Sequence, residues 1–117
     1  FQQSISVRGF SSLFRLLFNS SYLSSEYSNE VLNILSQSTF DKGLEAGLPK
    51  GIKVTNKFGE RDLPDGTAEL HDCGIIYYPK NPYLLCVMTS GKDDDKLASI
   101  ISQISKMVYD EVNSREI

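Results

Sequence analysis

The apolar residues at the start of the chain follow a helical period. Between Ser6 and Asn19, large apolar side chains recur at intervals of three and four residues: Phe10, Leu13, Phe14 and Leu17. This spacing places them on one face of a helix. Ser6 fits the N-cap of this helix, because its hydroxyl can accept a hydrogen bond from an unpaired backbone N–H of the first turn.

A second helix is predicted after Ser24 or Ser25, with Glu26 in its first turn, where an acidic side chain stabilises the helix dipole. Its inner face is expected to carry Tyr27, Val31, Ile34 and Leu35. Only the polar stretch 19–21 and a few further residues separate the two helices, so they are expected to form a hairpin. Residues 36–47 mix glycine and polar residues with a few apolar ones, which indicates a loop with a short helical turn.

Three strands are predicted in the second half of the chain. The first follows Leu48-Pro49 and Gly51 and runs through Ile52 and Val54 to Gly59. The turn residues Pro64-Asp65-Gly66 separate it from the second strand, 69–78, and residues 79–82 connect that strand to the third, 83–90. The last two strands are apolar on both faces, which is typical of strands that are covered on both sides.

A long helix is predicted at the end of the chain. Asp93-Asp94-Asp95 suits its N-terminus, because the backbone N–H groups there are unpaired. Its apolar stripe is expected to contain Leu97, Ile100, Ile101, Ile104, Met107, Val108 and Val112. Two-sided strands need two covering layers. The pattern therefore predicts an α/β (α+β) three-layer sandwich, in which an antiparallel three-strand meander lies between a helical hairpin and a long C-terminal helix.

Composition narrows the class of protein. At 117 residues the chain has the length of one domain, and 40% hydrophobic with 23% charged residues is ordinary for a globular fold. The formal net charge of −3 argues against a nucleic-acid partner, because the sequence has no stripe of basic residues that could bind a phosphate backbone. No apolar run reaches the roughly 18 residues of a membrane span. No metal or organic cofactor is implied.

The two cysteines are expected to be small buried thiols. Cys73 and Cys86 lie in apolar strands and have no metal-ligand spacing to the single histidine. If Tyr78 pairs with Tyr83, Cys86 lies opposite Ile75 and Cys73 lies opposite Met88, so that the thiols are diagonal and reduced. His71 and Asp72 are adjacent in a strand, so their side chains are expected on opposite faces and do not form an acid/base pair.

Four phrases of this sequence, in their order, resemble the C-terminal part of class A β-lactamases and penicillin-binding-protein-like serine hydrolases. They are Gly47-Leu48-Pro49, Lys57-Phe58-Gly59, residues 71–76 (HDCGII) and residues 83–89 (YLLCVMT). The resemblance covers essentially the whole chain, with residues 1–47 as the helical hairpin and loop and 48–117 as the strands and final helix of one domain. It implies acyl-enzyme chemistry on β-lactams or peptidoglycan-like amides.

The resemblance also implies the roles of individual residues. Lys57 would supply positive charge toward a substrate carboxylate, Gly59 would leave room for substrate, and the backbone N–H of Glu60 would be one oxyanion donor. Phe58 stands where the family has a substrate-binding hydroxyl, and Cys73 stands where many class A enzymes have arginine. Both departures remove donors to a carboxylate. Without the resemblance, Lys57 would be read as an exposed strand-end lysine, because lysine side chains are mostly solvated.

The serine nucleophile with lysine three residues later, and the Ser-x-Asn motif, do not occur in this chain. They would lie in a missing N-terminal part of the same domain, and the chain alone would be inactive. A catalytically dead homologue that serves as a binding or scaffold module, and an independent α+β interaction domain, remain alternatives. The resemblance implies a small-molecule or peptide substrate and an extracytoplasmic location. Open sheet edges would permit self-association.

Overall fold

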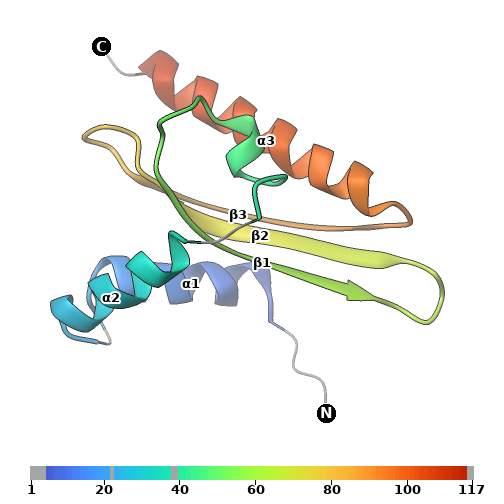
Figure 1. The fold of residues 1–117 in the computed structure, drawn as a ribbon, viewed down its shortest axis with the longest axis horizontal. Helices are drawn as coiled ribbons and strands as arrows, with labels where there is room; N and C mark the ends of the chain where they lie inside the picture. Colours follow the sequence, from blue (N-terminus) through green and yellow to red (C-terminus); the bar gives the residue numbers. More distant parts are fainter. Residues whose placement is uncertain (1–4, 22, 38–39, 116–117) are drawn as a thin grey trace.

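The computed structural model of the protein describes residues 5–21, 23–37 and 40–115. The elements follow in the order α1 (Val7–Phe18), α2 (Ser25–Leu35), the 3-10 turn η1 (Glu45–Gly47), β1 (Val54–Asp62), β2 (Ala68–Ile76), β3 (Tyr83–Gly91) and α3 (Asp94–Arg115). Helices α1 and α2 lie on one side of the sheet, and α3 with η1 lies on the other (Figure 1). The predicted three-layer sandwich is therefore confirmed.

The helical hairpin begins at the predicted caps. The Ser6 hydroxyl accepts a hydrogen bond from the backbone N–H of Gly9 at 3.0 Å, and the Ser24 hydroxyl accepts one from Tyr27 at 3.2 Å. The expected inner face of α2 is partly wrong, because Tyr27 and Ile34 are 60% and 67% exposed. The buried residues are Ser28 and Leu32. A serine at the contact lets α2 approach its neighbours more closely than tyrosine would, so the helix is rotated from the predicted phase.

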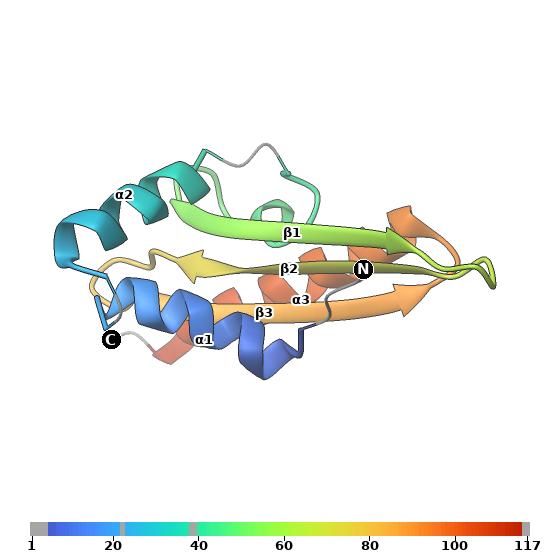
Figure 2. The ribbon, with the colours of Figure 1, turned by 90° about the horizontal axis from the view of Figure 1, so that it is seen from below.

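The sheet is the predicted antiparallel meander, in the order β1-β2-β3 (Figure 2). Directly paired residues share a face, and successive residues along a strand alternate between faces. The face toward α1 and α2 contributes Cys73 and Ile75 to a core with Phe14 and Leu32. The face toward α3 is covered by a second core, formed by Leu44, Ala68, Leu70, Val87, Leu97, Ala98 and Ile101.

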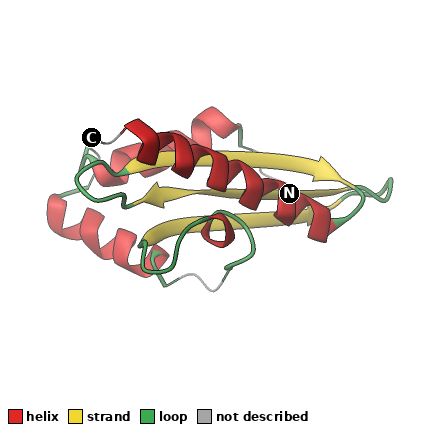
Figure 3. Ribbon diagram, turned by 90° about the horizontal axis from the view of Figure 1, so that it is seen from above, coloured by secondary structure: helices red, strands yellow, loops and turns green. Residues whose placement is uncertain are grey.

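Helix α3 runs across the face of the sheet opposite α1 and α2, in front of the strands in Figure 3. Asp93 caps it, because its side-chain oxygen accepts a hydrogen bond from the backbone N–H of Asp95 at 3.0 Å. The predicted stripe was too wide: Ile100 and Met107 are 44% and 70% exposed, whereas Leu97 and Ile101 are buried. Ile100 lies about 100° around the helix from Ile101, so the sheet cannot cover both.

The expected register of the second hairpin is wrong by two residues. Ile76 pairs with Tyr83, and residues 77–82 form the connection. Tyr78 leaves the ladder because its N–H donates to the carbonyl of Ile76 and its own carbonyl accepts from Asn81, closing a turn in which Lys80 has a positive φ of 69°. A shift of two residues keeps every side chain on its predicted face, so the core was still predicted correctly.

This register overturns the prediction of reduced thiols. Cys73 and Cys86 are direct cross-strand partners, and they form a disulfide. Their Cα atoms are 4.0 Å apart, compared with the diagonal arrangement expected from the sequence. The described part of the chain contains no free cysteine. The disulfide links the central strand to β3 beneath α1.

Candidate functional site

The segment Lys57–Glu60 lies in β1, which is an edge strand of the sheet and has β2 as its only neighbour among the described strands. Alternation places Lys57 and Gly59 on the face toward α1 and α2, and Phe58 and Glu60 on the face toward α3. The structure therefore brings the predicted site residues together on one strand edge but divides their side chains between two faces.

Lys57 and Gly59 lie on an open part of the sheet. Lys57 is exposed, and a Cβ atom built on Gly59 meets no atom within 4 Å. Toward the 62–68 hairpin the strands extend beyond α1 and α2 (Figure 2). The open space above Gly59 lies beside its cross-strand partner, His71, and two residues along the strand from Lys57, whose ammonium turns toward the ring of Phe58 at the strand edge.

Phe58 packs into the structure from the opposite face. Its ring stacks on that of Phe40, with centroids 4.4 Å apart and planes inclined by 20°, and it contacts the core beneath α3. The Lys57 ammonium is 5.2 Å from the centre of the Phe58 ring, within the range of a cation–π interaction. Phe58 anchors the edge strand and offers no hydrogen-bond donor to a ligand.

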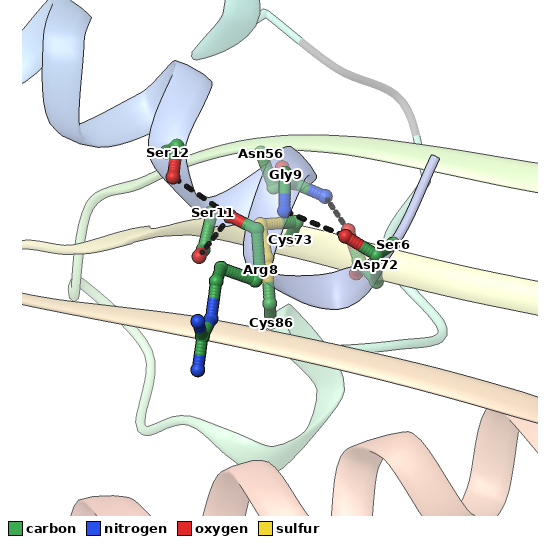
Figure 4. The surroundings of a disulfide bond; sticks show 9 residues. All are labelled: Ser6, Arg8, Gly9, Ser11, Ser12, Asn56, Asp72, Cys73 and Cys86. Atoms are coloured by element: carbon green, nitrogen blue, oxygen red, sulfur yellow. Dashed lines mark hydrogen bonds between the residues drawn. A yellow bond between two sulfur atoms is a disulfide. The ribbon is translucent and has the colours of Figure 1, made fainter. Parts of the chain in front are cut away.

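Cys73 is the cross-strand partner of Lys57, so the disulfide and the lysine belong to the same row of the sheet. The disulfide lies under the first turns of α1, near Arg8 and Gly9 (Figure 4). Cys73 is 1% exposed. A buried disulfide in this position cannot provide the positive charge that an arginine would.

His71 and Asp72 face opposite sides of the sheet, as predicted. The Nδ1 atom of His71 accepts a hydrogen bond from the backbone N–H of Thr89 at 3.3 Å, which leaves the proton of the neutral ring on Nε2. Nε2 is 3.9 Å from a carboxylate oxygen of Glu69, and Glu69 also pairs with Arg61 at 3.2 Å. These groups form a polar network on the open face beyond Gly59.

Asp72 was missed as a candidate by the sequence analysis, which considered it only beside His71. Its side chain is completely buried and accepts a hydrogen bond from the Asn56 amide at 2.9 Å (Figure 4). It also accepts one from the backbone N–H of Leu44 at 3.0 Å. Burial raises the pKa of the Asp72 carboxyl above its usual value, against the lowering effect of these hydrogen bonds. The available signal was an acidic residue inside an otherwise apolar strand.

The described residues contain no group of histidine, cysteine and acidic side chains arranged to hold a metal ion. None of the described helices has the length and apolar character needed to cross a bilayer.

Comparison with known proteins decides the family. The model of the β-lactamase enzyme family (Beta-lactamase2) matches residues 1–112. This chain belongs to the β-lactamase enzyme family. Comparison with curated protein sequences gave no match.

Solved structures of β-lactamases share the fold. A class A β-lactamase from Bacteroides cellulosilyticus is 26% identical with a TM-score of 0.81, and the match covers 92% of this chain and 41% of that one. The class A β-lactamase reconstructed for the last common ancestor of Gram-negative bacteria is also 26% identical, with a TM-score of 0.74 over 89% of this chain and 40% of that one. PBP-A matches at 21% identity and a TM-score of 0.76, covering 97% of this chain and 45% of that one. The chain thus spans less than half the length of these relatives.

Proposed function

We propose that this β-lactamase-family chain forms the C-terminal part of a serine hydrolase domain, with residues 1–47 and 48–117 packed as one unit. The substrate would be a β-lactam or a peptidoglycan-type amide. The observation that carries the proposal is an exposed lysine, Lys57, on an edge strand, two residues from Gly59, where an added Cβ atom would meet no other atom. An edge strand offers unpaired backbone groups to which an extended, peptide-like substrate can add.

In the proposed reaction, a serine from the remainder of the domain attacks the carbonyl carbon of the substrate amide. The C–N bond then breaks to give an acyl-enzyme, which water hydrolyses. This chain would supply the positive charge of Lys57, clearance at Gly59, and the backbone N–H of Glu60 as one donor to the oxyanion. Because the nucleophile is not among its motifs, the 117-residue chain alone is expected to be inactive.

Two observations favour a second candidate, a catalytically dead family member that acts as a binding or scaffold module. Phe58 faces the core beneath α3, and Cys73 is held in a disulfide, so neither can bind a substrate carboxylate. Under this alternative, the strand edge at Lys57 binds a ligand without covalent chemistry, and the edges of the sheet support association with another chain.

The proposed location is extracytoplasmic, periplasmic or secreted. The Cys73–Cys86 disulfide supports it, because disulfides persist in oxidising compartments and are rare in the cytosol. The family assignment points the same way.

The proposal is tested with the full-length domain, incubated with a fluorescent penicillin and resolved on a denaturing gel. The proposal is supported if the wild type forms a covalent adduct and Lys57→Met forms it ~100-fold more slowly, because removing one preorganised electrostatic group commonly lowers a rate by that much. A folded protein that neither forms an adduct nor shows serine-dependent amidase activity rejects it and favours the binding module. The isolated chain should form no adduct.

A further inference from the structure

Asp72 is a buried acidic residue that the proposed chemistry does not use. It is 0% exposed, it lies on the face of the sheet opposite Lys57, and it takes part in no ion pair among the described residues. A buried carboxylate costs free energy unless hydrogen bonds compensate its lost hydration. The hydrogen bonds of the Asp72 carboxylate must therefore offset the free energy that its burial costs.

The contacts of Asp72 converge on the segment that carries Lys57. Asp72 is the cross-strand partner of Phe58, and its carboxylate accepts the hydrogen bond of the Asn56 amide. Asn56 and Phe58 are the two neighbours of Lys57 on the strand, and both point toward α3. The inner face of the lysine segment is thus held by the Asn56–Asp72 hydrogen bond on one side and the Phe58–Phe40 stack on the other.

Asp72 also fixes the loop that precedes β1. Its second oxygen accepts from the N–H of Leu44, and the carbonyl of Leu44 accepts from the hydroxyl of Ser105 on α3 at 2.7 Å. Gly43 allows the approach, because a Cβ atom there would lie 2.6 Å from the Asp72 carboxylate. A continuous line of contacts therefore runs from α3 through Leu44 and Asp72 to Asn56.

The contacts of Asp72 matter because β1 is an edge strand. A central strand is held by two hydrogen-bonded ladders, whereas β1 is held by β2 alone among the described strands. Its position relative to a reacting group must then come from side-chain anchors. A displacement of about 1 Å in a positioning element can lower a reaction rate by about 100-fold.

We propose that Asp72 is a positioning residue for the active-site edge: its carboxylate holds Asn56 and the loop at Leu44 together, and thereby fixes Lys57 and the N–H of Glu60 at the height required for acylation. The inference rests on the proposed function for the chemistry, and on the structure alone for the anchoring. Asp72 itself exchanges no proton with substrate, because it lies behind the sheet.

The experiment compares four proteins: the wild type, Asp72→Ala, Asp72→Asn and Ser105→Ala. Asp72→Ala removes both acceptors. Asp72→Asn retains both contacts, because its oxygen can accept from Leu44 while its amide donates to a reoriented Asn56. Ser105→Ala is the matched control, since it loosens the same loop from α3 without touching β1.

Two quantities are measured. Hydrogen exchange at the amides of residues 57–60 is followed in the 117-residue chain, and the acylation rate constant and initial penicillin affinity are measured in the full-length domain. Asp72→Ala should raise exchange at these amides and lower the acylation rate constant ~10- to 100-fold with little change in affinity. Asp72→Asn and Ser105→Ala should stay within about threefold of wild type in acylation.

Each possible result either supports or overturns the positioning role of Asp72. The inference is overturned if wild type and Asp72→Ala have equal acylation rate constants and equal amide exchange. It is also overturned if Asp72→Asn lowers the acylation rate constant as much as Asp72→Ala does, because the effect would then come from the lost charge. If Ser105→Ala slows acylation equally, the contact is only structural and the inference also fails. If the wild type forms no adduct, the proposed function fails, and the exchange data still decide the anchoring. If Asp72→Ala does not fold, Asn56→Ala carries the same comparison.

Discussion

The ring of Phe58 stacks on the ring of Phe40 at a centroid separation of 4.4 Å, so the loop before η1 and the edge strand β1 are joined by an aromatic pair. Stacked aromatic pairs contribute about 0.5–1.5 kcal/mol beyond the burial of their surface. We expect Phe58→Leu and Phe40→Leu each to lower the free energy of unfolding, and the double variant to lower it by about 1 kcal/mol less than the sum. Urea denaturation of the four proteins measures this coupling, and strict additivity would show that the rings do not interact.

The disulfide should contribute substantially to stability. Cys73 and Cys86 are separated by 13 residues, and closing a loop of about 15 residues stabilises a fold by about 3 kcal/mol in the chain-entropy description. The free energy of unfolding of the reduced protein is therefore expected to be lower than that of the oxidised protein by about that amount. The reduced protein is prepared by treating the unfolded chain with a phosphine and letting it refold. The double variant Cys73→Ala/Cys86→Ala is the control, because reductant should not change its stability. Detection of two reactive thiols in the native, unreduced protein would contradict the disulfide.

Two glycines in the sheet should respond differently to the same substitution. At Gly74 an added Cβ would collide with the backbone carbonyl of Thr55, whereas at Gly59 it would meet nothing within 4 Å. Gly74→Ala is expected to destabilise the fold by about 2 kcal/mol or more, through the overpacking that the collision forces. Gly59→Ala should change stability by less than about 0.5 kcal/mol.

The Gly59→Ala variant also tests whether the space above Gly59 is needed for substrate, separately from any effect on folding. In the full-length domain, Gly59→Ala should slow acylation by the fluorescent penicillin while its melting temperature stays at the wild-type value. Unchanged acylation in Gly59→Ala would show that substrate does not pass over this residue. Thermal melts recorded beside the acylation assay make the comparison.

The titration of Asp72 should appear in the pH dependence of stability. Burial raises its pKa in the folded state above 3.8, the ordinary value of an aspartate side chain and the reference for the unfolded chain. Between those two values the native state holds a proton that the unfolded state has released, so the free energy of unfolding falls as pH rises through the window above 3.8. Above the folded pKa the contribution is constant.

Urea denaturation of the wild type and Asp72→Asn between pH 3.5 and 7, values chosen to bracket the ordinary range of a carboxyl group, isolates this contribution. The difference in unfolding free energy, wild type minus variant, is expected to decrease with pH and then to level off. Carboxylates common to both proteins cancel in the difference. A difference that rises with pH would mean that hydrogen bonds to Leu44 and Asn56 outweigh burial, and that the folded pKa is lowered.

The sequence was sufficient for the architecture because alternation and helical period are local properties. The caps at Ser6 and Ser24 and the two-sided apolar strands determined the element order and the layers. The matched phrases around Lys57 determined the family, which the family model over residues 1–112 confirms. The roles of Lys57, Gly59 and Glu60 in catalysis stay predictions.

Only the tertiary structure decided which groups meet. The hairpin register depended on a turn at Tyr78 that the spacing of the prolines did not reveal, and that register alone made Cys73 and Cys86 bonding partners. The burial of Asp72 depended on Leu44, which is 28 residues away along the chain. Periodic patterns record how a side chain faces relative to its own element, whereas pairing between elements depends on where the chain folds back, which no local pattern specifies.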